Sequence, residues 1–169
     1  STNFIALASV GFMLSALGIL NGQLLIADRL QTSPGSLIRL GILFIFFSLI
    51  GVANSTSLVH IYISLFFYGL GGGMLGPGIS ASLSLSVGKE NQGSASGFLG
   101  MVIPIGHVIS PIISMPLYTI NPSYPYLLGS FLMLFCLIFV LTNGRHKWIR
   151  KKNYREDYRT YTEEPPDLP

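Results

Sequence analysis

Residues 69–78 read "GLGGGMLGPG", which places six glycines and a proline between two apolar stretches. Glycine is a poor helix former in water, and proline interrupts helices. Two explanations account for such a segment: a loop that cradles a phosphate, or a helix that packs closely against other helices inside a membrane. The composition of the rest of the chain helps to decide between them.

The composition indicates a membrane protein. Half of the 169 residues are hydrophobic and only 10% are charged, whereas soluble domains carry about 25% charged residues. The charges are also unevenly placed, because twelve of them lie in residues 144–169. Residues 1–143 contain only Asp28, Arg29, Arg39, Lys89 and Glu90. A lipid environment explains this distribution, and a soluble fold does not.

Five apolar stretches predict an all-α, polytopic transmembrane bundle. A helix that crosses a bilayer needs about 20 largely apolar residues, and the five predicted spans are residues 4–27, 37–53, 59–83, 97–118 and 126–141. We expect residues 1–143 to form this bundle and residues 144–169, which lack apolar periodicity, to form a mostly disordered tail. The chain starts almost inside the first span, which suggests that it has been cut from something larger.

The positions of Lys and Arg predict the orientation of the bundle. Basic residues fall in the connections at 28–39 and 86–95 and in the tail, whereas the connections at 54–58 and 119–125 carry no charge. Cytoplasmic connections of membrane proteins are enriched in Lys and Arg. We therefore expect a multi-pass protein of the cell membrane with a cytoplasmic C-terminus.

Nucleotide binding is a poor explanation for the glycines. A phosphate-loop pattern fails at Gly88 and Lys89, because Glu90 stands where Ser or Thr is needed. A G-x-G-x-x-G pattern starts at Gly71, but it lies inside an apolar span instead of following a strand. In lipid, small residues three or four apart let helix backbones approach closely. We therefore interpret the glycines as helix-packing positions.

This interpretation divides the spans into two groups. Spans 4–27, 59–83 and 97–118 carry regularly spaced small residues and are expected to pack closely. Spans 37–53 and 126–141 are apolar nearly all round and are expected to face lipid. The candidate packing and gating residues are Gly18, Gly22, Gly69, Gly72, Gly73, Gly76, Pro77, Gly106, Ser110 and Pro111.

Three segments carry a resemblance to a known family. "LIADRL" (25–30) resembles the Asp-Arg loop motif of major facilitator superfamily transporters, without its flanking glycines and following basic residues. "KENQGSASG" (89–97) resembles the loop before the eleventh helix, and "GHVISPIIS" (106–114) resembles the antiporter signature G-x-x-x-G-P, with Ser110 replacing a glycine. Together they resemble the C-terminal half of bacterial drug:proton antiporters such as the tetracycline exporters.

The resemblance implies that the five spans are helices eight to twelve of a twelve-helix fold. In that fold the ninth and twelfth helices face lipid, the tenth lines the cavity, and the eighth and eleventh pack against the other half. The seventh helix and the N-terminal half would be missing partners of this chain. Asp28 and Arg29 would then belong to a gate latch between helices, and the alternative is that both are solvated loop charges.

Aromatic and polarizable side chains are candidate cavity residues. Such side chains suit apolar substrates of varied shape, and ordinary helix packing is the alternative for each of them. His107, deep in the span 97–118, has three possible roles: relaying a proton, bonding a substrate, or bonding a neighbouring helix. The candidates are Tyr62, Phe66, Tyr68, Met74, Met101 and His107.

Together with the resemblance, these features predict part of a secondary active transporter that moves small amphipathic compounds across the membrane, by drug or metabolite efflux in exchange for protons. The alternative is a non-transporting membrane subunit or truncated remnant that acts by helix association. The sequence contains neither H-E-x-x-H nor G-x-S-x-G, so we expect no enzyme, and also no cofactor, metal or nucleic-acid partner.

No Asp or Glu lies inside a predicted span. Because a carboxylate is the usual intramembrane proton carrier, we expect the coupling acid in the missing portion.

Overall fold

Five long helices make up the computed structural model, which describes residues 2–29 and 33–143. They are α1 (Thr2–Arg29), α2 (Pro34–Ala53), α3 (Leu58–Ser86), α4 (Gln92–Ile120) and α5 (Tyr124–Asn143), and a short 3₁₀ turn, η1 (Lys89–Asn91), precedes α4. Each long helix contains a stretch that is apolar and long enough to cross a membrane. The predicted all-helical bundle is therefore confirmed for the described residues. The tail predicted for residues 144–169 lies outside them.

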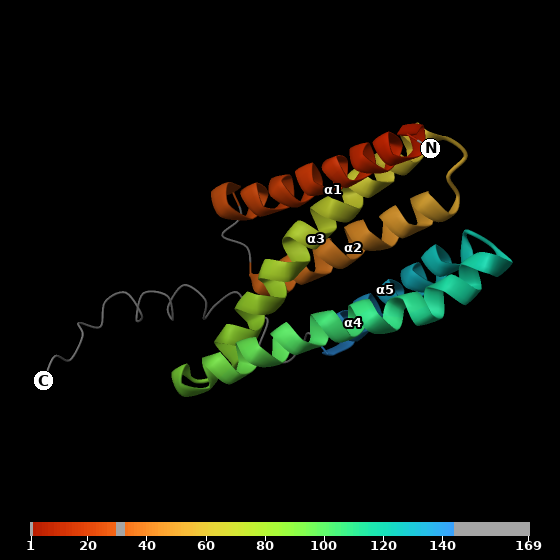
Figure 1. Cartoon of the computed structure of the whole chain (residues 1–169). Coiled ribbons are helices and arrows are strands. Elements are labelled where there is room, and N and C mark those ends of the chain that lie inside the picture. Colours follow the sequence, from red (N-terminus) through yellow and green to blue (C-terminus); the bar gives the residue numbers. More distant parts are fainter. Residues whose placement is uncertain (1, 30–32, 144–169) are drawn as a thin grey trace, which may run out of the picture.

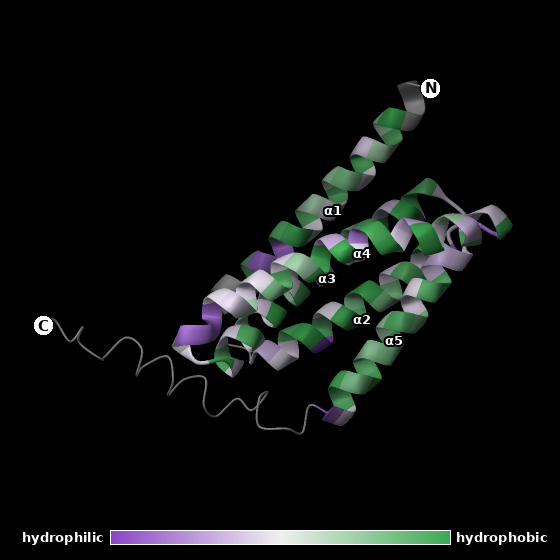
Figure 2. Ribbon diagram, turned by 60° about the horizontal axis from the view of Figure 1, so that its bottom comes forward, coloured by the Kyte–Doolittle hydropathy of each residue, from purple (hydrophilic) through white to green (hydrophobic). Residues whose placement is uncertain are grey.

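Successive helices run in opposite directions, as Figure 1 shows. The α2–α3 and α4–α5 connections therefore lie at one end of the bundle, and η1 lies at the other. Apolar residues cover most of the helices, and hydrophilic residues gather towards the ends (Figure 2). Helices α3 and α4 have 29 residues each, which is about 44 Å of helix. Both are thus longer than the hydrocarbon core of a bilayer, which is about 30 Å thick.

The centre of the packing is α3, which contacts α1 on one side and α2 on another. Helix α2 also contacts α5, whereas α4 contacts mainly α5 and touches α3 less extensively. The buried apolar side chains come from α2 and α3: Leu37, Ile42, Ile45, Leu70 and Met74. Helices α1 and α4 lie at opposite edges of the bundle in Figure 1.

Carbonyl groups of α1 lie directly against glycines of α3, and carbonyl groups of α3 lie directly against glycines of α1. A methyl group at Gly69 would overlap the Ser15 carbonyl, and one at Gly73 would overlap the Ile19 carbonyl. In the opposite direction, a methyl group at Gly18 would overlap the Phe66 carbonyl. Gly22 is equally confined, because its added carbon would lie 2.6 Å from the Leu70 carbonyl oxygen. Only glycine fits at these positions, so the small-residue spacing here allows direct backbone contact.

The α2–α3 contact depends on a second glycine pair. A methyl carbon at Gly41 would lie 2.8 Å from the Gly71 carbonyl oxygen, and one at Gly71 would lie 2.7 Å from the Gly41 carbonyl oxygen. Nearby, the hydroxyl of Ser48 donates a 2.7 Å hydrogen bond to the carbonyl of Ser64 in a buried position. Seven residues of α2 are buried. The expectation that span 37–53 mainly faces lipid therefore needs correction, because Gly41 opens one side of it to α3.

Three of the expected packing glycines have no close neighbour. An added methyl carbon at Gly72, Gly76 or Gly106 would meet no described atom within 4 Å. Pro77, Ser110 and Pro111 are exposed as well. In the part of the chain that the structure describes, these six residues therefore do not mediate helix packing. The glycines Gly72 and Gly76 instead lie on a third side of α3, away from both α1 and α2.

Candidate substrate site

An apolar pocket lies between the first halves of α1 and α3. Its volume is about 390 Å³, which is within the range of pockets that bind small molecules. The lining residues are Leu7, Ala8, Gly11, Phe12, Ser15, Leu58, Ile61, Tyr62, Leu65 and Tyr68. We call this cavity the α1–α3 pocket.

Gly11 and two tyrosines determine the shape of the α1–α3 pocket. Gly11 leaves space opposite α3, since a methyl carbon there would lie 2.9 Å from Leu65 Cδ1. The Tyr62 hydroxyl donates a 3.1 Å hydrogen bond to the Leu7 carbonyl and so links the two helices across the pocket. The Tyr68 side chain is 44% exposed. Three of the ten lining residues are thus aromatic, namely Phe12, Tyr62 and Tyr68, and most of the others are aliphatic.

The chemistry of the lining favours an uncharged ligand. No Asp, Glu, Lys, Arg or His belongs to the ten lining residues, and the polar side chains among them are hydroxyls. Transfer of an unpaired charge into such surroundings is costly, because no opposite charge compensates the lost hydration. A predominantly apolar compound with a hydrogen-bonding group matches the pocket better than a salt or a zwitterion.

Of the six candidate cavity residues, only Tyr62 and Tyr68 line this pocket. Phe66 packs edge-on against Phe67, with ring centroids 5.9 Å apart. Met74 is 4% exposed and belongs to the core, so the expectation that it lines a cavity is not met in the described structure. Met101 and His107 are exposed on α4.

For the two candidate gating residues, the structure describes the backbone alone. The backbone of Asp28 and Arg29 belongs to the last turn of α1, but their side chains lie outside the described residues. The latch expected from the Asp-Arg motif therefore stays a prediction.

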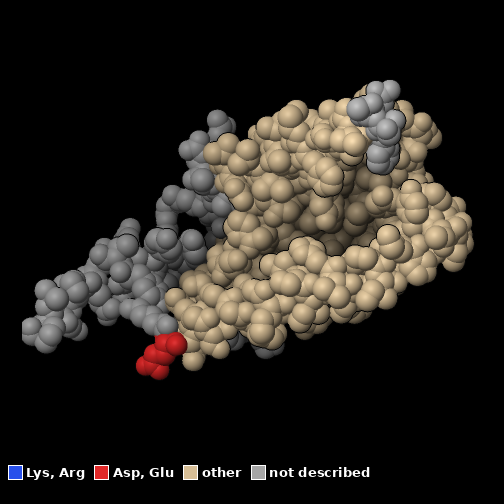
Figure 3. Space-filling view, viewed as in Figure 1, with Lys and Arg blue, Asp and Glu red and all other residues tan. Residues whose placement is uncertain are grey.

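A hollow separates the α1–α3 side of the bundle from α4, as the space-filling view in Figure 3 shows. The face in this view carries no charged group among its described residues except an acidic one at one end of the bundle. The described residues also contain no group of three His, Cys, Asp or Glu side chains that would hold a metal ion.

Five membrane-length helices, backbone contacts at small residues and an uncharged pocket define part of a polytopic membrane bundle. Residues 1–164 match the Major Facilitator Superfamily, and the chain belongs to this family. This family consists of membrane transporters and is not a family of enzymes.

A solved structure of a POT family transporter, in complex with a thioalcohol-conjugated peptide, has a similar fold. The TM-score is 0.70 with 23% sequence identity, and the match covers 91% of this chain. The same match covers 34% of the POT transporter, so this chain spans about a third of the length of that protein. No curated protein matches the sequence.

Proposed function

We propose that this chain supplies part of the substrate pathway of an exporter for small amphipathic compounds. The α1–α3 pocket carries the proposal, because it is apolar, free of charged lining groups and bordered by Tyr62 and Tyr68. Promiscuous sites for apolar compounds typically combine aromatic walls with a few polar groups that fix orientation. The rest of the pathway belongs to the remainder of the transporter.

Export of Nile red, a neutral amphipathic dye, tests this proposal in cells that express the full-length protein. Replacing Tyr68 with Ala removes an aromatic wall and is expected to slow export by about tenfold, since one aromatic contact contributes about 1 kcal/mol or more. Tyr118→Ala is the matched control, because Tyr118 is exposed on α4 and lies outside the pocket. If the two variants export the dye equally well, the pocket is not part of the pathway.

We also propose that the transporter is a proton antiporter, of the subtype whose signature the segment "GHVISPIIS" (106–114) resembles. The coupling carboxylate then lies outside this chain. The support for antiport is that resemblance, and the support for a carboxylate elsewhere is that no Asp or Glu lies inside a predicted span. A protonophore should stop Nile red export at constant ATP. Continued export would exclude proton coupling.

The alternative function, a non-transporting subunit, predicts that purified full-length protein in liposomes moves no dye under any gradient.

The proposed orientation places η1 in the cytoplasm and the α2–α3 connection outside. Its support is the position of Arg39 and Lys89 on one side of the bundle and the uncharged connections on the other. A single cysteine at Ser57, in a Cys136→Ser background, should react with an impermeant maleimide added to intact cells. Reaction only after the cells are opened would reverse the orientation.

A further inference from the structure

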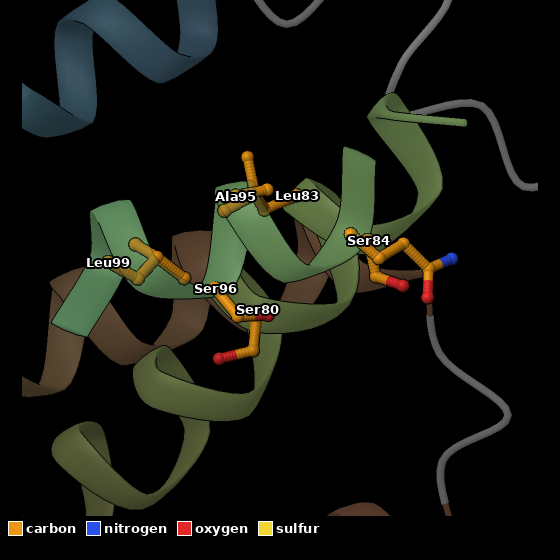
Figure 4. Close-up of a pocket in the computed structure, with 7 residues that line it drawn as sticks. Ser80, Leu83, Ser84, Ala95, Ser96 and Leu99 are labelled. Carbon is orange, nitrogen blue, oxygen red and sulfur yellow. The ribbon is translucent and has the colours of Figure 1, made fainter. Parts of the chain in front are cut away.

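A second pocket lies between the last turns of α3 and the first turns of α4, at the end of the bundle opposite to the α2–α3 connection. Its volume is about 210 Å³, enough for several water molecules or a small polar group. Ser80 and Ser84 come from α3, Gln92 and Ser96 from α4, and Leu83 and Leu99 close its sides. Figure 4 shows Ser80 and Ser96 next to each other between the two helices. We call this cavity the serine pocket.

The three hydroxyls of the serine pocket lack the hydrogen bonds that several other helical hydroxyls make within their own helices. Ser9, Ser86 and Ser130 each donate a hydrogen bond to a carbonyl of their own helix, at 2.8–2.9 Å. Among the hydrogen bonds of the described residues, none involves the hydroxyl of Ser80, Ser84 or Ser96. The Ser82 hydroxyl, on the same stretch of α3, is buried without a described partner.

Ser80, Ser84 and Ser96 are exposed, so a hydrogen-bonding occupant of the cavity can take the place of the water that their hydroxyls bind. These three hydroxyls come from two helices and face one cavity, with the amide of Gln92 beside them. Amide and hydroxyl groups both donate and accept hydrogen bonds. No lining residue carries a charge. An uncharged group with several hydrogen-bonding atoms matches this lining.

The serine pocket is separate from the α1–α3 pocket. Tyr68 borders the α1–α3 pocket and Ser80 borders the serine pocket. Ser80 follows Tyr68 by twelve positions on the same helix, which correspond to about 18 Å. A small molecule cannot occupy both pockets at once. The α1–α3 pocket is lined mainly by apolar and aromatic groups, and hydroxyl and amide groups line the serine pocket, so the two pockets suit chemically different groups.

We propose that the serine pocket is a second subsite of the transport pathway, which binds the uncharged hydrogen-bonding end of the compound that the transporter moves. This inference rests on the proposed function, because it assumes that an amphipathic compound passes through the protein. The compound meets the two pockets at successive steps, one at each end of α3.

A matched pair of probes tests the subsite: Nile red and 2-hydroxy-Nile red, which differ by one hydroxyl group. In the full-length protein, the triple variant Ser80→Ala, Ser84→Ala, Ser96→Ala should slow export of the hydroxylated dye by about tenfold, as expected for one or two lost hydrogen bonds. Export of Nile red should stay within about twofold of wild type. Ser86→Ala is the control, because its hydroxyl already bonds to the Leu83 carbonyl. Equal effects on both dyes, or none, would overturn the inference.

A binding measurement separates this inference from the proposed function. A cysteine at Ser84, in a Cys136→Ser background of the purified full-length protein, is treated with a maleimide in the presence of either dye. The hydroxylated dye should slow the reaction more than Nile red does at the same concentration. Equal protection by both dyes contradicts the subsite even if export is normal. Selective protection without export of either dye would retain the subsite and reject the transport proposal.

Discussion

Helices α3 and α4 have the same length and a similar content of glycine, serine and proline, but their surroundings differ. Seven residues of α3 are buried, whereas no residue of α4 is. The glycines Gly69, Gly71 and Gly73 of α3 lie against carbonyl groups of α1 and α2. Gly97, Gly100 and Gly106 of α4 have no described atom within 4 Å of an added methyl carbon. Regularly spaced small residues thus allow a close approach, but they do not specify which element approaches.

The largest expected effect distinguishes two adjacent glycines of α3. Gly73→Leu should lower the stability of the full-length protein by about 3 kcal/mol, the upper end of overpacking costs, because its side chain would collide with the α1 backbone at Ile19. Gly72→Leu is the control, since its position is open. Thermal unfolding in detergent measures both variants. Similar melting temperatures for the two would contradict the distinction between closed and open sides of α3.

A smaller substitution extends the comparison to α4. Gly71→Ala should destabilise the protein by about 1–3 kcal/mol through overpacking, since the added carbon would lie 2.7 Å from the Gly41 carbonyl oxygen. Gly106→Ala should be neutral or stabilising by up to about 1 kcal/mol, because alanine is a better helix former than glycine. The melting temperatures should therefore shift in opposite directions. A large loss of stability at Gly106 would reveal a close neighbour of α4 outside the described residues.

The buried hydrogen bond between α2 and α3 should have a moderate effect. Ser48→Ala removes the donor to the Ser64 carbonyl and should cost about 0.6–1 kcal/mol, as interhelical bonds in membranes do. Ser130→Ala is the matched control, because Ser130 donates to Leu127 in its own helix, α5. Chemical unfolding in mixed micelles compares the two. A larger loss for Ser130 would show that the α2–α3 bond contributes little.

The smallest effect is expected at His107 on α4. Its side chain is exposed, and no described hydrogen bond involves it, so His107→Gln should leave the pH dependence of transport unchanged. The amide retains hydrogen-bonding ability without titrating near neutral pH. Nile red export measured from pH 5.5 to pH 8 provides the profile. A clearly displaced profile would assign His107 to proton transfer.

Much of the fold follows from the sequence because lipid imposes simple requirements. Each spanning helix must be long and apolar, and these properties can be read directly from residues 1–143. The packing partners are harder to predict, because they depend on tertiary contacts. Gly41 has no small residue three or four positions away from it within the span 37–53, so its pairing with Gly71 has no signal in local spacing. Gly72 fits the spacing rule as well as Gly73 does, but it faces no described element.

The candidate site was predictable only in part, because it also depends on tertiary contacts. Tyr62 and Tyr68 lie on the side of α3 that meets α1, and their aromatic character marked them as cavity residues. Met74 has a similar character but faces the core. The residues that α1 contributes, among them Gly11 and Phe12, could be found only once the α1–α3 contact was known. The serine pocket depends on a contact between α3 and α4 and was not predicted.

Cysteine accessibility along α3 tests most directly the claim that this helix is closed on two sides and open on the third. Single cysteines at Gly72 and at Ser64 are introduced into the full-length protein in a Cys136→Ser background and treated with a small methanethiosulfonate reagent. Ser64 is 5% exposed and accepts the hydrogen bond from α2 at its carbonyl, whereas Gly72 has an open position. Rapid reaction at Gly72 and slow reaction at Ser64 is the predicted result. Slow reaction at Gly72, or equal rates at both positions, would contradict it.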